Sequence, residues 1–174
     1  MAIETAQILK QLNLQPERTI RVVAWMAEEI GIFGGKAYAK QHAAEMGNHF
    51  AAIETDLGAG HPLGINVCCD GASLKILQPI ANVLETSGAG VLRSSEETGA
   101  DIIPLKVAGV PTFSPIQDLR KYFDYHHTAA DTLDKIDPHE LQENAAVVDV
   151  LAHALATMQA ELPREPQSVP DWLK

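Results

Sequence analysis

Several features that would place this 174-residue sequence outside the ordinary globular proteins are missing from it. The only cysteines, Cys68 and Cys69, are adjacent and do not form an ordinary structural disulfide, so the redox compartment stays open. No apolar run reaches the roughly 18 residues of a membrane-spanning helix. The first residues have no basic region followed by an apolar block, so no signal peptide is visible and the localisation stays unknown.

Positive charge is also scarce. Lys and Arg number 13 against 23 Asp and Glu, which gives a formal net charge of −10 at pH 7. This balance argues against a phosphate-binding surface and therefore against nucleic acid as a partner. The hydrophobic fraction is 46%, and the length suits one domain with a substantial core.

Short apolar runs alternate with stretches of helical spacing along the chain. The runs predict strands at 19–26, 49–54, 65–69, 88–93 and 110–113. The helical patterns cover 2–12, 36–46, 73–86, 101–107 and 137–162. This alternation predicts an α/β protein with three α/β/α layers and a central mixed, mostly parallel sheet.

Proline and acidic residues mark the starts of two of these helices and the interior of a third. Asp137, Pro138 and Glu140 are typical of a helix start, with an Asp cap, Pro at the first position and Glu three residues after the cap. Asp101 is expected to cap the helix that ends near 107. Pro79 is expected to kink or split the helix around it.

Two adjacent carboxylates, Glu28 and Glu29, follow the first predicted strand. In open α/β sheets, chemistry gathers beyond the carboxyl ends of the strands. Like charges a few ångströms apart disfavour joint ionisation, and a bound metal resolves that conflict. The alternative is a solvated Glu-Glu pair at a turn, which this stretch alone favours because the dipeptide is common.

Two further stretches carry the same kinds of side chain. Asp56 follows the second predicted strand, and His126 and His127 lie in a long connection, 114–136. Long loops without structure of their own are usually functional or disordered, and the aromatic and histidine content favours function here. Carboxylate and imidazole groups are ligands of catalytic zinc, although sequence spacing does not establish that they converge.

Taken together, these stretches resemble successive motifs of the two-zinc exopeptidases, a family that includes bacterial leucyl aminopeptidases and the plasma glutamate carboxypeptidase (carboxypeptidase Q) group. The resemblance rests on AEEIG at 27–31, ETDLG at 54–58 and YHHTAADTL at 125–133. The stretches GADI at 99–102 and GVP at 109–111 are similar as well, in the right order. The match extends from about residue 2 to about residue 160.

The resemblance implies a role for each of four residues. Glu28 would be the general base, Glu29 a ligand of one zinc, and Asp56 and His127 ligands of the other. The implied reaction is hydrolysis of a peptide bond, in a peptide or dipeptide substrate, by water activated on the metal. Whether the enzyme trims amino-terminal residues or acts as a carboxypeptidase or dipeptidase stays open.

The neighbouring residues are given supporting or unrelated roles. By the same resemblance, His126 is a supporting or structural residue, and Asp131 fixes the His127 loop by accepting backbone hydrogen bonds. His61 is a weak candidate for an additional ligand, and His153 is expected to be solvated.

The sequence departs from the family at one point. The family supplies a further zinc-binding histidine and an aspartate that bridges both metals, upstream of the Glu-Glu motif. The 27 residues before Glu28 contain neither histidine nor aspartate. A stable catalytic zinc usually has three protein ligands. We therefore expect residues 1–162 to be the C-terminal part of the catalytic domain, with partial or absent zinc occupancy and weak or no activity alone.

Three further expectations concern the sheet edge, the C-terminal residues and the alternative function. The sheet would lack several strands, and its exposed edge would favour self-association. Residues 163–174 would form a flexible tail. The alternative function is a catalytically inert binding module of the same fold.

Overall fold

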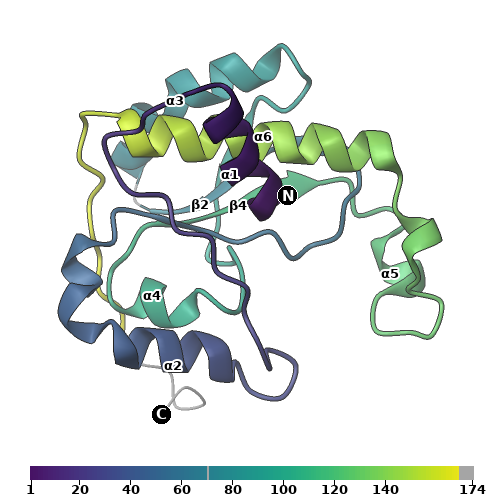
Figure 1. Cartoon of the computed structure of the whole chain (residues 1–174), viewed down its shortest axis with the longest axis horizontal. Helices are drawn as coiled ribbons and strands as arrows, with labels where there is room; N and C mark the ends of the chain where they lie inside the picture. The colour runs from purple at the N-terminus through teal and green to yellow at the C-terminus, as the bar shows by residue number, and fades with distance from the viewer. Residues whose placement is uncertain (70, 169–174) are drawn as a thin grey trace.

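A four-stranded mixed sheet lies at the centre of the computed structural model, which describes residues 1–69 and 71–168 (Figure 1). The strands are β1 (Ala52–Ile53), β2 (Pro62–Cys68), β3 (Val91–Ser94) and β4 (Thr112–Gln117), in the order β1-β4-β2-β3. The pairs β1–β4 and β2–β3 are parallel, and β2 runs antiparallel to β4. The predicted mixed, mostly parallel sheet is therefore confirmed.

Helices cover both faces of this sheet (Figure 1). On one face lie α3 (Gly71–Glu85) and α6 (Pro138–Thr157), with α1 (Ala2–Gln11) packed on α6. On the other face lie α2 (Phe33–Gln41) and α4 (Ile103–Val107). The shorter elements are the 3₁₀ helices η1 (Ala43–Asn48) and η2 (Leu133–Lys135) and the one-turn helix α5 (Tyr122–Tyr125).

The two faces have hydrophobic cores of very different size. Between the sheet and the α3/α6 layer, Phe113, Val67 and Leu151 are at most 1% exposed and belong to a large apolar cluster. On the α2/α4 face the buried cluster consists of Met46, Leu105 and Val110. Apolar burial drives folding roughly in proportion to area, so the α3/α6 side carries most of the stabilisation.

The predicted strand at 19–26 is not a strand. Within the described residues the segment is extended but pairs with no neighbour, and Val22 and Met26 are 40% and 76% exposed. An apolar run forms a strand only where another strand offers backbone partners, and here a groove separates the segment from β1.

Several other boundaries shift. The second helix ends at Gln41 and continues as 3₁₀ helix η1, β1 keeps only two residues of the predicted 49–54, and β4 extends to Gln117. Pro79 lies inside an uninterrupted α3, so the expected split is wrong. Packing of Leu77, Ile80 and Leu84 against the core offsets the hydrogen bond that Pro79 cannot donate.

The last helix begins where the sequence predicts. The Asp137 carboxylate accepts hydrogen bonds from the backbone N–H groups of His139, at 2.8 Å, and Glu140, at 3.3 Å. The helix ends at Thr157, five residues before the predicted end, and Gln167 donates its N–H to the Val107 carbonyl at 3.0 Å. The predicted tail thus makes one backbone contact next to α4 in its described part, and its flexibility stays a prediction; 169–174 lie outside the described residues. No described helix is long and apolar enough to cross a membrane.

Candidate active site

A tight turn carries Glu28 and Glu29 into the start of α2. Ala27 has φ 60° and Gly31 has φ 131°, and the N–H groups of Gly31 and Ile32 both donate to the Glu28 carbonyl at 2.9 Å. Glu28 is half-buried and Glu29 is exposed. The turn is thus fixed by its backbone, and its two carboxylates lie in different environments.

Gly35 holds this turn against the loop that precedes α4. A Cβ atom at Gly35 would lie 2.2 Å from the Asp101 carbonyl oxygen, so only glycine permits this approach of two backbones. The close contact joins the Glu28–Glu29 turn to the 99–102 loop, two stretches far apart in sequence.

Glu54 anchors the same loop to the end of β1. Its carboxylate is 5% exposed and accepts the N–H groups of Ala100 at 2.8 Å and Ile102 at 2.9 Å. Burial raises the pKa of Glu54 to about 7, against the opposing effect of these backbone hydrogen bonds. In the sequence, Glu54 is the last residue of the predicted strand 49–54 and was given no role; its position at the end of an apolar run was the available signal.

His127 and Glu29 are in direct contact. The Nε2 atom of His127 lies 3.0 Å from an Oε1 atom of Glu29, and both side chains are more than half exposed. His127 has φ 58°, and its ring stacks on His126 with 3.8 Å between centroids. His126 also stacks on Tyr122 at 4.6 Å, so the imidazole pair is held by an aromatic neighbour.

Asp56 interacts with this pair through its charge. Partial burial of the carboxyl group raises the pKa of Asp56, although the residue as a whole is solvent-accessible. The negative charge of Glu29 raises it further, and the imidazoles of His126 and His127 act in the opposite direction. Glu29, Asp56 and His127 are therefore close enough to influence one another.

Asp101 adds a fourth carboxyl group to those of Glu28, Glu29 and Asp56. The sequence predicts that Asp101 caps α4, and this prediction is wrong. Ile102 occupies the cap position without a side-chain hydrogen bond, and Pro104 lies in the first turn as expected. Asp101 is 7% exposed, and within the described residues its Oδ1 atom has no hydrogen-bond partner. Burial, followed by the charges of Glu28 and Asp56, raises the pKa of Asp101 to about 6. Four acids thus converge on one region, an arrangement that favours a bound cation.

The donor types suit zinc, but the described residues do not complete a zinc site. Carboxylate oxygen and imidazole nitrogen are ordinary zinc ligands. Nevertheless, the described part of the chain contains no group of three or more His, Cys, Asp or Glu residues arranged to hold a metal ion. The contact joins two donors, Glu29 and His127, where a catalytic zinc usually has three protein ligands.

Several of the other residues considered from the sequence lie elsewhere or act differently. His61 pairs through Nδ1 with Glu143 on α6 at 2.9 Å. His153 is half-buried, and its buried Nδ1 atom has no hydrogen-bond partner among the described residues, which corrects the expectation that it is solvated. Among the described residues, no hydrogen bond to the Asp131 carboxylate is found; the Thr128 hydroxyl instead donates to the Tyr125 carbonyl at 2.7 Å.

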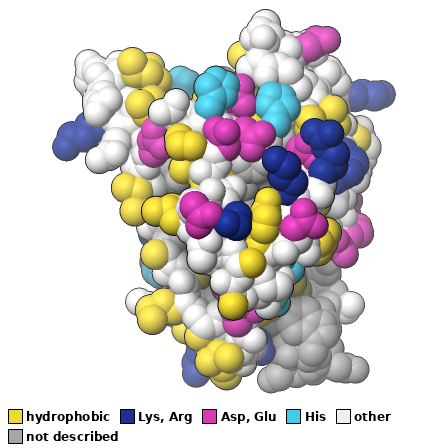
Figure 2. All heavy atoms as spheres, turned by 90° about the vertical axis from the view of Figure 1, so that its right-hand side faces the viewer, with side chains coloured by type: hydrophobic (Ala, Val, Ile, Leu, Met, Phe, Trp, Pro, Cys, Tyr) yellow, Lys and Arg dark blue, Asp and Glu magenta, His cyan; other side chains and the backbone are white. Residues whose placement is uncertain are grey.

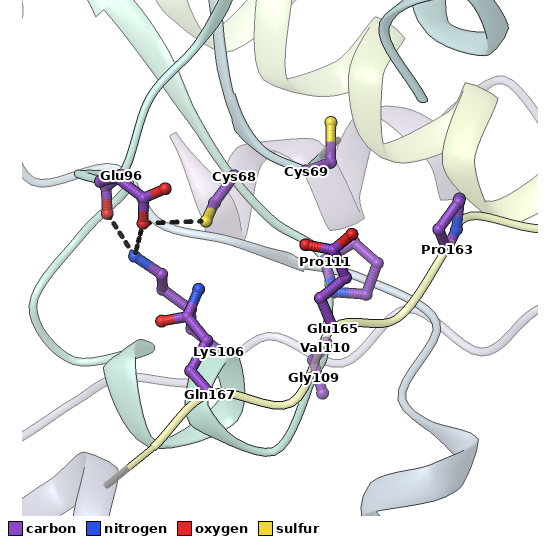
Figure 3. A pocket seen from close by; sticks show the side chains of 10 residues that line it. All are labelled: Cys68, Cys69, Glu96, Lys106, Gly109, Val110, Pro111, Pro163, Glu165 and Gln167. Atoms are coloured by element: carbon purple, nitrogen blue, oxygen red, sulfur yellow. Dashed lines mark hydrogen bonds and ion pairs between the residues drawn. The ribbon is translucent and has the colours of Figure 1, made fainter. Parts of the chain in front are cut away.

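A pocket of about 50 Å³ lies beside Cys68 and Cys69, away from the acidic region (Figure 3). Lys106 Nζ and Glu96 Oε2 are 2.9 Å apart at its edge, and Cys68 Sγ lies 3.9 Å from the same carboxylate. The hydrogen bond from Lys106, with its charge, lowers the pKa of Glu96. These polar groups satisfy one another, so the pocket is a weaker candidate than the acidic region.

On the side of the molecule shown in Figure 2, acidic and histidine side chains lie next to one another at the surface.

Comparison with known proteins identifies the family of the chain. The sequence profile described as "Peptidase family M28" matches residues 1–152, so the chain belongs to peptidase family M28. The chain is 35% identical to carboxypeptidase Q of Mus musculus over 161 residues, covering 92% of this chain and 34% of that protein. Carboxypeptidase Q of Homo sapiens is 34% identical over the same coverage. The chain thus spans about a third of the length of the curated relatives it matches.

Solved structures confirm the fold. A peptidase M28 precursor from Shewanella amazonensis superposes with a TM-score of 0.87 and 41% identity, covering 94% of this chain and 37% of that one. An aminopeptidase from Aneurinibacillus sp. strain AM-1 has a TM-score of 0.69 at 23% identity, covering 97% and 40% respectively. Both place the chain in the fold of the M28 peptidases.

Proposed function

We propose that this chain forms part of the active site of a zinc-dependent exopeptidase that hydrolyses peptides or dipeptides. Glu28 is the general base, and Glu29, Asp56 and His127 are metal ligands. The observation that carries the proposal is the 3.0 Å contact between Glu29 and His127, 98 residues apart in sequence, with Asp56 in electrostatic contact with both. Both aminopeptidase and carboxypeptidase or dipeptidase activity are compatible with this site.

The Glu29–His127 contact favours a different assignment of ligands to the two zinc ions from the one that the resemblance implies. Glu29 and His127 lie together, which suits two ligands of one zinc, whereas the resemblance grouped His127 with Asp56. Because the described donors are one short of three, a zinc held here needs at least one further ligand. We propose weak or no hydrolysis by this chain alone.

The chain's own residues suit the proton transfers of peptide hydrolysis. A general base takes a proton from the attacking water and passes it to the leaving amine, so it must be held within reach of both. Glu28 is held by a turn whose backbone is pinned to the 99–102 loop through Gly35. Burial and then the charges of Glu28 and Asp56 raise the pKa of Asp101 to about 6, so the Asp101 carboxyl lies within electrostatic range of Glu28.

Metal binding and activity test this proposal separately. Zinc binding is measured by calorimetry on the chelator-treated chain, and hydrolysis with aminoacyl anilides and a dipeptide panel. We expect His127→Ala to weaken zinc binding at least about tenfold, since even loss of a residue that only supports a zinc ligand typically costs about 10–100-fold in affinity. The matched control is His61→Ala, which removes a histidine paired with Glu143 outside the site. Any hydrolysis that is present should fall about 10²–10⁴-fold in Glu28→Gln, the contribution typical of a general base.

The inert binding module is the second candidate, because the described residues contain no group of three or more donors arranged to hold a metal ion. Under that alternative, His127→Ala and His61→Ala bind zinc equally weakly and no substrate is hydrolysed. Full activity with two bound zinc ions would instead contradict the incomplete donor set.

A further inference from the structure

The segment that carries His127 has little structure of its own to hold it in place. The helix directly before the histidine pair, α5, is a single turn, and none of its residues is buried. His127 is exposed and has φ 58°, a backbone conformation that is uncommon for residues other than glycine. Helices as short as α5 are not stable alone. The place of His127 therefore depends on contacts between α5 and the rest of the domain.

Tyr122 makes such a contact with Gly58. A Cβ atom at Gly58 would lie 2.9 Å from Cδ2 of the Tyr122 ring, so the ring packs directly on the Gly58 backbone. Gly58 also has φ 79°, in the left-handed region that favours glycine. The close approach and the backbone conformation both call for glycine at this position, two residues after Asp56.

Two buried amides fix the backbone at Gly58. Gln117 on β4 donates its Nε2–H groups to the Gly58 carbonyl at 2.8 Å and to Oδ1 of Asn144 on α6 at 2.9 Å. The amide nitrogen of Asn144 donates to the Gly60 carbonyl at 2.7 Å. Gln117 and Asn144 are 6% and 0% exposed, and buried networks that are fully hydrogen-bonded are rigid. Tyr122 therefore packs against a rigid part of the domain.

From Tyr122 a stack of rings continues to the candidate metal ligands. Tyr122 and His126, four residues apart, stack with 4.6 Å between centroids. His126 stacks in turn on His127 at 3.8 Å, and Nε2 of His127 lies 3.0 Å from Oε1 of Glu29. The stack thus sets the direction in which the His127 imidazole points.

Tyr122 also lies near the acids of the site. The residue is half-buried, and burial raises the pKa of its hydroxyl. The negative charges of Asp56, Asp131 and Glu29 raise this pKa further. Tyr122 is therefore adjacent to the carboxylates as well as to the imidazoles.

We propose that Tyr122 is a positioning residue, which holds His127 against Glu29. Its ring packs on Gly58 and stacks on His126, and both contacts are made by the ring rather than by the hydroxyl. Groups that orient zinc ligands typically contribute about 10–100-fold to metal affinity. The effect on metal binding rests on the proposed function, whereas the position of His127 does not.

Nuclear magnetic resonance of the metal-free chain tests the position of His127 directly. In the parent, nuclear Overhauser cross-peaks should connect the His127 ring with the ring of His126 and with the side-chain CH₂ groups of Glu29. We expect Tyr122→Leu to lose these cross-peaks, and Tyr122→Phe, which keeps the ring, to retain them.

Two further variants complete the comparison. Phe123→Leu makes the same kind of change at the neighbouring residue, whose side chain is 73% exposed, and should keep the cross-peaks. Gly58→Ala pushes the Tyr122 ring away and should lose them, so the inference stays testable if Tyr122→Leu does not fold. Tyr122→Leu and Phe123→Leu should unfold at the same urea concentration, since α5 contributes no buried residue to the core.

Zinc titration of the same chains adds the metal. We expect Tyr122→Leu to bind zinc about 10–100-fold more weakly than the parent, and Tyr122→Phe to bind within about twofold of it. A weaker affinity without a change in the unfolding midpoint distinguishes positioning of His127 from a general effect on stability.

Three results would overturn the inference. They are a parent without the His127–Glu29 cross-peak, retention of that cross-peak in folded Tyr122→Leu and Gly58→Ala, and an equal loss in Tyr122→Leu and Phe123→Leu. Failure of the parent to bind zinc would instead contradict the proposed function, and the metal-free spectra would still decide the role of Tyr122.

Discussion

The two sides of this molecule differ in how their backbone groups and apolar side chains are satisfied. Around β2, β4 and β3, every strand has a neighbour and the α3/α6 layer closes a large core. Around β1 and the segment 19–25, two extended stretches face each other across a groove without pairing. The comparison teaches that an apolar run is by itself a sufficient signal neither for burial nor for a strand, because a strand also needs a backbone partner.

The candidate site lies at the boundary between these regions. Its parts are joined by polar contacts, the Glu54 carboxylate on the 99–102 loop and the Glu29–His127 pair, rather than by a core of its own. The carboxyl groups of Glu54 and Asp101 have raised pKa values, and such shifts are typical of functional sites.

Truncating a side chain in each region gives the largest expected contrast. Phe113→Ala on β4, where the ring is fully buried, should lower the free energy of unfolding by about 3–5 kcal/mol. Val22→Ala, in the 40% exposed segment, should change it by less than about 0.5 kcal/mol. Urea unfolding followed by circular dichroism measures both. Similar losses would mean that 19–25 is packed in solution, contrary to the comparison.

The pH dependence of stability reports on Glu54, which joins the two regions. Its pKa of about 7 in the fold is above the ordinary 4.5, so the protonated form stabilises the fold. This contribution is fully present below pH 4.5 and is lost as the pH rises through 7, by up to about 3 kcal/mol. Asp101, with a pKa of about 6, acts in the same direction.

Glu54→Gln isolates this contribution. With metal chelated, the unfolding free energy of Glu54→Gln should decrease less between about pH 4.5 and 7 than that of the parent. The difference between the two decreases is the contribution of Glu54 to the pH dependence. The exposed Glu97→Gln is the matched control and should follow the parent curve. A Glu54→Gln curve parallel to the parent across this window would show that Glu54 titrates normally.

A pair of glycine substitutions gives the smallest expected difference. Gly35→Ala places a Cβ atom 2.2 Å from the Asp101 carbonyl oxygen and should cost about 1–3 kcal/mol as the backbones separate. Gly47→Ala meets nothing within 4 Å, and Gly47 does not have the positive φ that a helix-ending glycine often adopts. It should be neutral or stabilising by up to about 1 kcal/mol. Thermal melting of both variants checks this, and an unchanged Gly35→Ala would disprove the backbone contact.

Local patterns predicted the long elements best. The cap at Asp137 and the spacing of α3 and α6 depend on neighbours within a turn or two, so the sequence contains the whole signal. The boundaries of β1 and β4 and the state of 19–26 depend on pairing with distant strands, and there the expectations failed. The prediction that Pro79 splits its helix was wrong because packing against the core outweighs the local effect of the proline.

The site shows the same division. Motif resemblance selected Glu28, Glu29, Asp56 and His127, and the fold brings the last three into mutual contact or electrostatic range. Their roles remain predictions. Glu54 was left without a role, and Asp101 was taken for a cap, because what distinguishes them is burial beside distant backbone, which no spacing reveals.

By itself, the sequence determined the α/β class, the family motifs and the ends of the long helices, since these follow from periodicity and short-range hydrogen bonds. Only the tertiary structure decided which apolar runs pair, that Glu29 lies 3.0 Å from His127, and that a groove separates 18–25 from β1. Pairing and proximity between residues far apart in the chain are fixed by the packing of the whole domain, because each strand and each buried acid takes its partner from another part of the chain.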